Sequence, residues 1–314
     1  MVKAPHKALW DQVGVPLACL KERLDVLFHP KFTVPVLAPC KTVMVLHGAG
    51  WFMPEFEGFW SQADLRYVRR AMPIYCRAAA KVISVSQVTT DTFNRVFNLP
   101  EGKIQTVYFA PGRYFKRVTE PSILEAVRAK YSLPEQFIFT LSGRDRGDRK
   151  NFAGILSAFK TQHGKSPHHL VVGGKDCAMF RQDYSIPEDG YGRDIHFPGW
   201  IEQADLPAIY SMADVFLYPS NVEAFPIPIT EALACGTPII TSNANGLLEL
   251  VGEAAMLVDA GNFDQIGAAL ERVLGDPALS ADLSARGLER SKMFSWERCA
   301  RETLQILRDA AGKG

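Results

Sequence analysis

Two glutamates, Glu223 and Glu231, flank an apolar, proline-containing stretch of the 314-residue chain. They lie eight positions apart in "YPSNVEAFPIPITEALACGTPIITS", residues 218–242. A buried strand is expected before them, and Pro228 suits the first turn of a following helix. We expect Glu231 in that first turn and Glu223 in the loop above the strand end. Backbone N–H groups and carboxylates there suit the phosphates and paired hydroxyls of a nucleotide. A surface glutamate plus a helix-capping one is the open alternative.

A cationic loop follows another predicted strand, in "SGRDRGDRKNFAGILSAF". The strand ends at Ser142–Gly143 and a helix should begin near Asn151. The cations between them are Arg144, Arg146, Arg149 and Lys150. Cations at a strand end beside a helix start can hold a diphosphate. A solvated loop neutralised by Asp145 and Asp148 is the alternative, and it fits Arg146 and Arg149 better than Arg144 and Lys150.

His47 ends a third predicted strand, in "VMVLHGAGWF". A dinucleotide fingerprint is not expected here, because Met53 replaces the third glycine and Pro54 interrupts the helix. The next segment, "GWFMPEFEGFW", is rich in aromatic side chains. Such a loop can stack on sugars or enter a membrane surface, but packing as a lid or on the core is the favoured interpretation.

Short apolar runs alternate with amphipathic ones along the chain, which is typical of parallel sheets with helical crossovers. The predicted strands are "DVLFHP", "KTVMVLHG", "KVISVS", "IQTVYF", "FIFTLSG", "LVVGG", "IHFPG", "DVFLYPS", "TPIITS" and "AMLVD". The predicted helices are 63–79, 87–96, 151–160, 203–212, 228–234, 264–274 and 295–307, with a linker over 112–122. Two Rossmann-like domains facing each other across a cleft are therefore expected, with the ligand beyond the carboxyl ends of the strands.

Composition excludes several classes of function. Lys plus Arg number 35 and Asp plus Glu 34, so nothing favours nucleic-acid binding in general. The six cysteines form no CxxC pair, which argues against a zinc knuckle or a disulfide framework and favours a reducing cytoplasm. No metal-binding motif and no run long enough to span a membrane is present in the sequence.

Taken together, the ordered segments resemble the retaining nucleotide-sugar glycosyltransferases often called family four, which have the GT-B fold. The resemblance is carried by "SGR", "RKNFAGILSAF", "VVGG", "FPGWIEQADLPAIYSMADVFLYPS", "EAFPIPITEALACGTPIITS", "GLLELVGEAAMLVD" and "SWERCARETLQIL". The segments "FHPKFTVPVLAPCKTVMVLHG" and "VISVSQVTTDTF" look like the first domain of that family. The resemblance covers most of the chain, but it does not include the usual N-terminal strands, so the first domain is expected to be incomplete.

The resemblance implies a role for each candidate residue. Arg144 and Lys150, after Gly143, would hold the donor diphosphate, and Glu231 the ribose hydroxyls. Glu223 would lie against the donor sugar, and His47 would contact the sugar or the reacting centre. The remaining contacts implied are backbone N–H groups of Phe225 and Ile227 on the sugar, and the turn at Trp200 and Ile201 on the base. The catalytic set implied is thus His47, Glu223, Arg144 and Lys150.

Three residues depart from the family pattern. Ala224 and Pro226 stand where family members usually have glycine, and Gly48 stands where aspartate is common. Pro226 donates no backbone N–H, so one expected contact with the donor sugar is in doubt. The departures bear on the identity of the sugar more than on the nucleotide.

The resemblance therefore implies an acceptor-side domain over 1–117, a nucleotide-sugar-binding domain over 118–295, and a helix over 296–314 that packs back toward the first. The implied activity is metal-independent, retaining transfer of a hexose, such as mannose, from a UDP- or GDP-sugar to a glycan or lipid-linked acceptor, without a cofactor. The implied location is cytoplasmic and peripheral to the membrane, with a second copy or a partner chain covering the shortened domain. A non-catalytic nucleotide-binding subunit and an enzyme that cleaves or epimerises nucleotide sugars are the alternatives.

Overall fold

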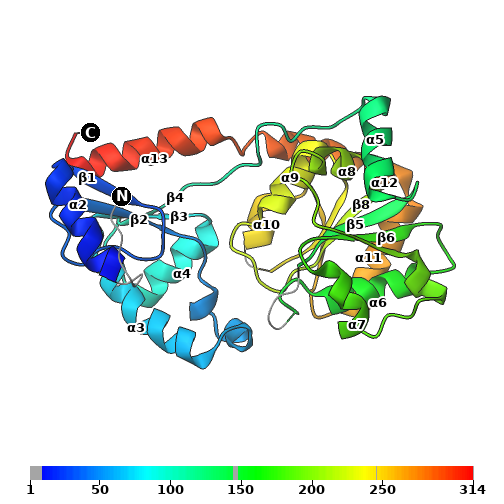
Figure 1. The fold of residues 1–314 in the computed structure, drawn as a ribbon, viewed down its shortest axis with the longest axis horizontal. Helices are drawn as coiled ribbons and strands as arrows, with labels where there is room; N and C mark the ends of the chain where they lie inside the picture. Colours follow the sequence, from blue (N-terminus) through cyan, green and yellow to red (C-terminus); the bar gives the residue numbers. More distant parts are fainter. Residues whose placement is uncertain (1–8, 144–147, 245, 314) are drawn as a thin grey trace. The chain divides into compact units, whose positions relative to one another are not determined.

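The computed structural model describes residues 9–143, 148–244 and 246–313, which form two compact units. The first unit consists of two segments, one that ends at Phe109 and one that begins at Ser295. The second unit is the continuous segment Ala110–Phe294 (Figure 1). Each unit contains one parallel β-sheet flanked by helices. The predicted α/β class with two Rossmann-like sheets is confirmed, whereas the predicted domain limits stay predictions.

The first unit is built on a four-stranded sheet with the order β1-β2-β3-β4. Its strands are β1 (Val26–His29), β2 (Lys41–Leu46), β3 (Lys81–Ser84) and β4 (Ile104–Thr106). Its helices are η1 (Trp10–Gly14), α2 (Val15–Glu22), η2 (Gly50–Phe52), η3 (Pro54–Phe59), α3 (Gln62–Ala78), α4 (Gln87–Phe97) and α13 (Trp296–Ala311). All four strands pair in parallel, as the apolar runs predict.

Helices cover both faces of this sheet. Helix α13 packs against β1, β2 and β3, on the opposite face from α3 and α4 (Figure 1). The core under α3 and α4 includes Phe93 and Phe97, and the ring of Phe52 lies 5.2 Å and 5.1 Å from theirs. Core packing of the aromatic segment, the favoured interpretation, is therefore confirmed for Phe52.

The second unit is built on a six-stranded parallel sheet with the order β10-β9-β8-β5-β6-β7. Its strands are β5 (Phe137–Leu141), β6 (His169–Gly173), β7 (Ile195–Gly199), β8 (Val215–Tyr218), β9 (Ile239–Ser242) and β10 (Met256–Val258). Its helices are α5 (Pro121–Tyr131), α6 (Phe152–Gln162), η5 (Cys177–Met179), α7 (Phe180–Asp183), η6 (Gly190–Asp194), α8 (Leu206–Met212), α9 (Ile227–Cys235), α10 (Gly246–Val251), α11 (Phe263–Gly275) and α12 (Pro277–Ser291).

The strand order reverses between β5 and β8. From β5 the chain adds β6 and β7 on one side, and from β8 it adds β9 and β10 on the other. Helices α6 and α11 pack together over a hydrophobic core cluster of this unit, and α8 packs on α9 (Figure 1). In a parallel sheet of this kind the reversal opens a crevice at the carboxyl ends of the two strands, where ligands bind.

None of the helices in the described part of the chain is both long enough and apolar enough to cross a bilayer.

Candidate functional site at the carboxyl ends of β5 and β8

Residues 148–151, which precede helix α6, provide the capping bonds of that helix. Asp148 accepts the backbone N–H of Phe152 and Ala153 at 2.6 Å and 3.0 Å. Asn151, the N-cap residue, accepts the N–H of Gly154 at 3.2 Å and donates its amide to the carbonyl of Pro219 at 3.0 Å. These bonds stabilise the helix start and join it to the loop after β8.

Lys150 and Glu223 meet at this junction. The Lys150 ammonium forms an ion pair with Oε1 of Glu223 and donates to the hydroxyl of Tyr218. The same carboxylate oxygen accepts the Tyr218 hydroxyl at 2.8 Å and the Ser220 hydroxyl at 3.2 Å. The ion pair is mostly buried, since the side chains of Lys150 and Glu223 are 18% and 9% exposed. Two residues that sequence reasoning assigned to one site are thus in contact.

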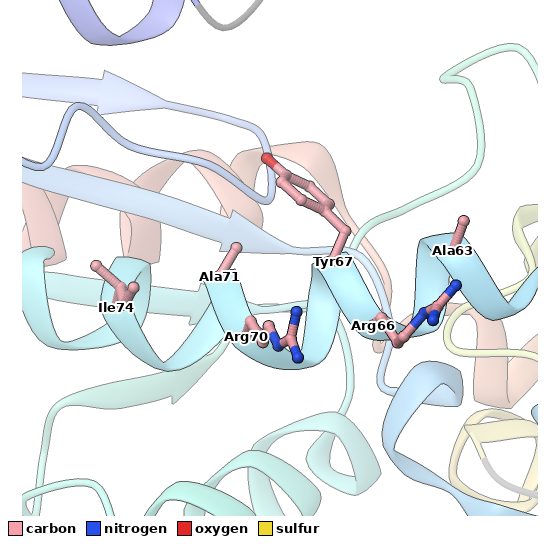
Figure 2. A pocket seen from close by; sticks show the side chains of 6 residues that line it. All are labelled: Ala63, Arg66, Tyr67, Arg70, Ala71 and Ile74. Carbon is pink, nitrogen blue, oxygen red and sulfur yellow. The ribbon is translucent and has the colours of Figure 1, made fainter.

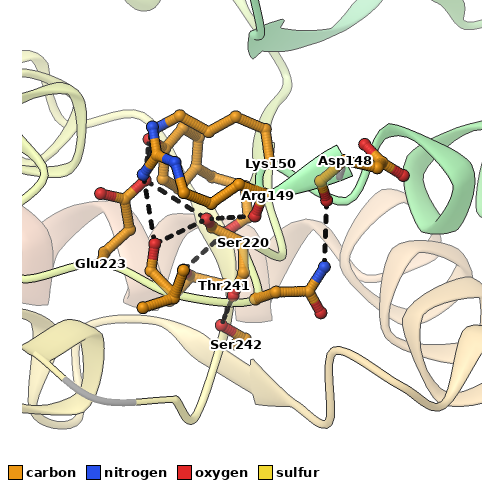
Figure 3. A network of polar contacts seen from close by, with 10 residues as sticks. Asp148, Arg149, Lys150, Ser220, Glu223, Thr241 and Ser242 are labelled. Atoms are coloured by element: carbon orange, nitrogen blue, oxygen red, sulfur yellow. Dashed lines mark hydrogen bonds and ion pairs between the residues drawn. The ribbon is translucent and has the colours of Figure 1, made fainter. Parts of the chain in front are cut away.

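Arg149 joins the same cluster, contrary to expectation. Its Nη1 lies 3.2 Å from Oε1 of Glu223 and 3.3 Å from the carbonyl of Val222 (Figure 3). The interpretation of Arg149 as a solvated charge neutralised by Asp148 is wrong, because Asp148 caps α6. Arg149 and Lys150 are the described cations at these strand ends that can hold a diphosphate. Arg144, Asp145 and Arg146 lie outside the described residues.

The charges of this cluster set the protonation of Glu223. Burial alone would raise the pKa of its carboxyl, but the charges of Lys150 and Arg149 outweigh burial and hold that pKa below its ordinary value. Hydrogen bonds from Lys150 and Tyr218 act in the same direction. Glu223 is therefore ionised at neutral pH.

Glu231 has a different environment. The prediction that it lies in the first turn of its helix is wrong, because α9 begins at Ile227 and has no acidic residue in its first turn. Glu231 is 6% exposed and its Oε2 accepts the Tyr210 hydroxyl at 3.1 Å. Burial raises the pKa of the Glu231 carboxyl to about 7, and the Tyr210 hydrogen bond opposes that rise. The pKa values of Glu223 and Glu231 are thus shifted in opposite directions, which is typical of functional sites.

The turn between Glu223 and α9 is closely packed. Phe225 is buried with its ring 5.8 Å from that of Phe294, whereas Ile227, the first residue of α9, is exposed. The N–H of Gly246 donates to the carbonyl of Glu223 at 3.3 Å. A Cβ at Gly246 would lie 2.2 Å from the carbonyl oxygen of Ala224, so the glycine permits this approach.

The carboxyl ends of β5 and β7 carry three other described residues of the predicted site. Gly143 follows β5, and Trp200 and Ile201 follow β7. Trp200 is 68% exposed, whereas Ile201 is buried. The Ile201 side chain reaches within 2.5 Å of the position that a Cβ of Gly173 would take, so it packs on the end of β6. Trp200 is thus available to a ligand, and Ile201 supports the turn.

His47 belongs to the first unit, and the other described site residues belong to the second. It follows β2, with its Nε2 3.3 Å from the carbonyl oxygen of Pro30. Its ring lies 5.5 Å from Phe32 and 6.0 Å from Phe109. The expected position of His47 at a strand end is confirmed, while its role stays a prediction.

Helix α3 of the first unit carries a shallow pocket on its exposed side. The pocket has a volume of about 550 Å³ and is lined by Ala63, Arg66, Tyr67, Arg70, Ala71 and Ile74 (Figure 2). Arg66 and Arg70 are one helical turn apart and lie beside the exposed apolar groups of Tyr67 and Ile74. Cationic and apolar groups on one helix face are typical of contact with an anionic amphiphile.

Three polar side chains of the site were not found from the sequence, namely Tyr210, Tyr218 and Ser220. Tyr218 ends β8 and Ser220 follows it, so their places at a strand end were the available signal. Tyr210 lies inside an apolar helix, where a tyrosine is typically a core residue. Among the residues that the structure describes, no three His, Cys, Asp or Glu side chains are arranged to hold a metal ion.

Comparisons with known proteins identify the family of the chain. Residues 125–290 match the family model "Glycosyl transferases group 1". The chain is 29% identical over 294 residues to the O-antigen chain mannosyltransferase B of Escherichia coli, an alignment that covers 91% of this chain and 74% of that protein.

Two solved structures share the fold. Sucrose-phosphate synthase from Thermosynechococcus elongatus aligns with a TM-score of 0.77 at 22% identity, over 99% of this chain and 81% of its own. HepE from Anabaena, in complex with UDP and glucose, aligns with a TM-score of 0.76 at 20% identity, over 98% and 84%. Because the family model spans more than half of the chain and covers both glutamates, Lys150 and the strands that carry them, this protein belongs to the group 1 glycosyltransferases.

Proposed function

We propose that this glycosyltransferase moves a hexose from a UDP- or GDP-sugar to a hydroxyl of a glycan or lipid-linked acceptor, with retention of configuration and without a metal ion. The observation that carries the proposal is the contact of Lys150, Arg149 and Glu223 at the strand-order reversal, in the loop that leads to the helix bearing Glu231. Mannose is the proposed hexose because the Escherichia coli relative is named a mannosyltransferase. The HepE complex supports a nucleoside diphosphate as the leaving group.

In the proposed reaction, the bond between the anomeric carbon and the donor phosphate oxygen breaks while the acceptor oxygen bonds to the same carbon from the same face. The acceptor proton passes to the departing phosphate oxygen, so the products are a glycoside and a nucleoside diphosphate. Lys150, Arg149 and Arg144 would stabilise the charge that grows on the phosphate, as preorganised cations do in a water-poor site. No strong protein base is then needed.

The other residues would position the donor. Glu231 would accept the ribose hydroxyls, and Glu223 would lie against the donor sugar, together with backbone N–H groups of Phe225 and Ile227. The turn at Trp200 and Ile201 would meet the base, and Gly143 would lie at the donor site. His47 would contact the donor sugar or the reacting centre.

Contact with the membrane and with a second chain are further proposals. The arginines and apolar side chains on α3 support a peripheral contact with an anionic lipid surface on the cytoplasmic side. A groove of about 480 Å³ between α2 and β1 is lined mostly by apolar side chains, and Leu17 and Leu20 beside it are each 60% exposed. Exposed apolar surface of this kind supports a second copy or a partner chain.

The proposal predicts acceptor-dependent transfer. The protein is incubated with UDP- and GDP-hexoses and glycan acceptors in the presence of EDTA, and the product anomer is assigned by NMR. We expect release of a nucleoside diphosphate and a product with the anomeric configuration of the donor, and loss of both in Lys150→Ala.

An inverted product, or a rate that EDTA abolishes and a divalent metal restores, would contradict the mechanism. Nucleotide binding without transfer to any acceptor would favour the non-catalytic subunit instead. Free sugar or an epimer formed without an acceptor would point to an enzyme that cleaves or epimerises nucleotide sugars.

A further inference from the structure

Tyr210 and Glu231 form a buried pair inside the second unit. The Tyr210 hydroxyl on α8 donates to Oε2 of Glu231 on α9 at 3.1 Å. Tyr210 is fully buried, and Glu231 is almost so. A buried tyrosine hydroxyl that donates to a carboxylate needs an explanation, because a phenylalanine would fill the same space.

The fold fixes the direction of this hydroxyl. The Tyr210 ring packs against Phe139 of β5 and Phe216 of β8, with centroids 5.3 Å and 5.2 Å away. Its backbone carbonyl accepts the Thr237 hydroxyl at 2.7 Å. Because the ring cannot turn without disturbing two strands, the hydroxyl stays on Glu231 and orients its carboxyl group.

Among the described residues, three titratable groups interact with Glu231. They are Tyr210 on α8, Cys235 on α9 and Tyr114 in the segment before α5. Burial disfavours the ionised carboxyl of Glu231, and the Tyr210 hydrogen bond favours it. A carboxylate offers about four acceptor positions, so one bond to Tyr210 leaves room for two ligand hydroxyls.

We propose that Tyr210 is a positioning residue: its hydroxyl orients the Glu231 carboxyl and favours its ionised form, which accepts the ribose hydroxyls of the nucleotide sugar. This inference rests on the proposed function, because it takes the ribose as the ligand group of Glu231. Donor binding is then linked to a proton, since the ionised carboxyl accepts two hydroxyls more strongly than the protonated carboxyl does.

The linkage has a defined pH range. The pKa of Glu231 is raised to about 7, so a donor that binds only the ionised form loses about tenfold in affinity between pH 8 and pH 6. Removing the Tyr210 hydroxyl raises the pKa further, by about one unit for a hydrogen bond of ordinary strength to a charged group. The midpoint of the pH profile then moves up.

The experiment compares Tyr210→Phe with the unaltered protein by calorimetric titration of GDP-mannose and UDP-glucose from pH 5.5 to 8.5. Both phosphates of these ligands are esterified, so they do not titrate in this range. We expect weaker binding and a higher midpoint in Tyr210→Phe, and no pH dependence in Glu231→Gln. Tyr191→Phe, which removes a hydroxyl from η6 of the same unit, should behave as the unaltered protein.

A second ligand separates positioning from a structural effect. At pH 8, GDP or UDP is compared with its 2′,3′-dideoxy form, which lacks the ribose hydroxyls. Tyr210→Phe should weaken binding of the normal nucleotide several-fold and leave binding of the dideoxy form unchanged, which also reports that the variant is folded. Equal losses for both ligands, or an unmoved midpoint, overturn the inference while the proposed function stands. If no nucleotide binds the unaltered protein, both fail.

Discussion

Glu231→Gln is expected to stabilise the second unit at pH 8 and, at the same time, to weaken nucleotide binding about 100-fold. Glu231 has a pKa of about 7 in the folded protein and 4.5 as a reference value. Because the folded state holds the Glu231 proton more tightly than the unfolded state does, Glu231 contributes to the free energy of unfolding below pH 4.5. This contribution is lost as the pH rises through 7. At pH 8 the ionised Glu231 lowers the free energy of unfolding by about 3 kcal/mol. Because the glutamine side chain carries no charge, Glu231→Gln can restore up to this amount.

Calorimetric unfolding at pH 5.5 and pH 8 measures this effect. For a unit of this size about 3 kcal/mol corresponds to roughly 6–12 °C in melting temperature. The gain should be largest at pH 8 and less than half as large at pH 5.5. The weaker nucleotide binding reflects loss of charge-assisted hydrogen bonds to two hydroxyls. Glu271→Gln, at an exposed position of α11, is the control. A variant that melts lower than the unaltered protein at pH 8 would contradict the assigned environment of Glu231.

The second large effect is an asymmetry between Lys150 and Glu223. In Lys150→Ala the Glu223 carboxylate keeps Arg149, Tyr218 and Ser220 as partners. We therefore expect a small loss of stability, about 1 kcal/mol. Catalytic efficiency, measured as kcat/KM, should fall roughly 100- to 1,000-fold, which is typical of removing a group that stabilises transition-state charge. Lys165→Ala, an exposed lysine of the same unit, should leave both quantities unchanged.

Glu223→Ala should behave differently. It leaves Lys150 and Arg149 close together and mostly buried without their carboxylate, which costs about 3–5 kcal/mol of unfolding free energy. The double variant Lys150→Ala/Glu223→Ala should be more stable than Glu223→Ala alone, because it no longer buries the unpaired Lys150 charge. A double-mutant cycle measures this coupling between Lys150 and Glu223. The Glu223 contribution has the opposite pH sign to that of Glu231. It is present above the unfolded pKa and is lost as the pH falls through the lowered folded value. If Glu223→Ala unfolds at the same urea concentration as the unaltered protein, the buried ion pair is not as described.

The central strands were predictable because they are short apolar runs buried on both faces, as in "FIFTL" of β5 and "VFLY" of β8. The helices were less predictable from the sequence than the strands. The amphipathic helix α12 follows α11 directly, with no strand between them, so a strict alternation of strands and helices gives it no place. Helix α5 begins at Pro121, within the segment interpreted as a linker, because proline is compatible with both.

The residues of the site were predictable one at a time, but not their contacts. Lys150 follows β5 and Glu223 follows β8, and the next strand in sequence after β5 is β6. Their ion pair depends on β5 lying beside β8, which is a property of strand order that apolar periodicity does not encode. Arg149 was misjudged for a related reason, because Asp148 is its near neighbour in sequence while its partner in space is Glu223, 74 positions along.

The protonation of the two glutamates was also beyond the sequence. Both belong to one apolar segment, yet Glu223 is surrounded by cations and Glu231 by apolar groups and a tyrosine hydroxyl. Burial and neighbouring charge come from three-dimensional packing and not from local composition.

The most direct test of the donor site is a calorimetric titration of UDP, GDP and ADP into the unaltered protein at pH 8, with Lys150→Ala and Glu231→Gln alongside. Our account predicts that UDP or GDP binds at one site per chain and that each substitution weakens this binding strongly. Absence of binding by all three nucleotides, or binding that neither substitution affects, would contradict it.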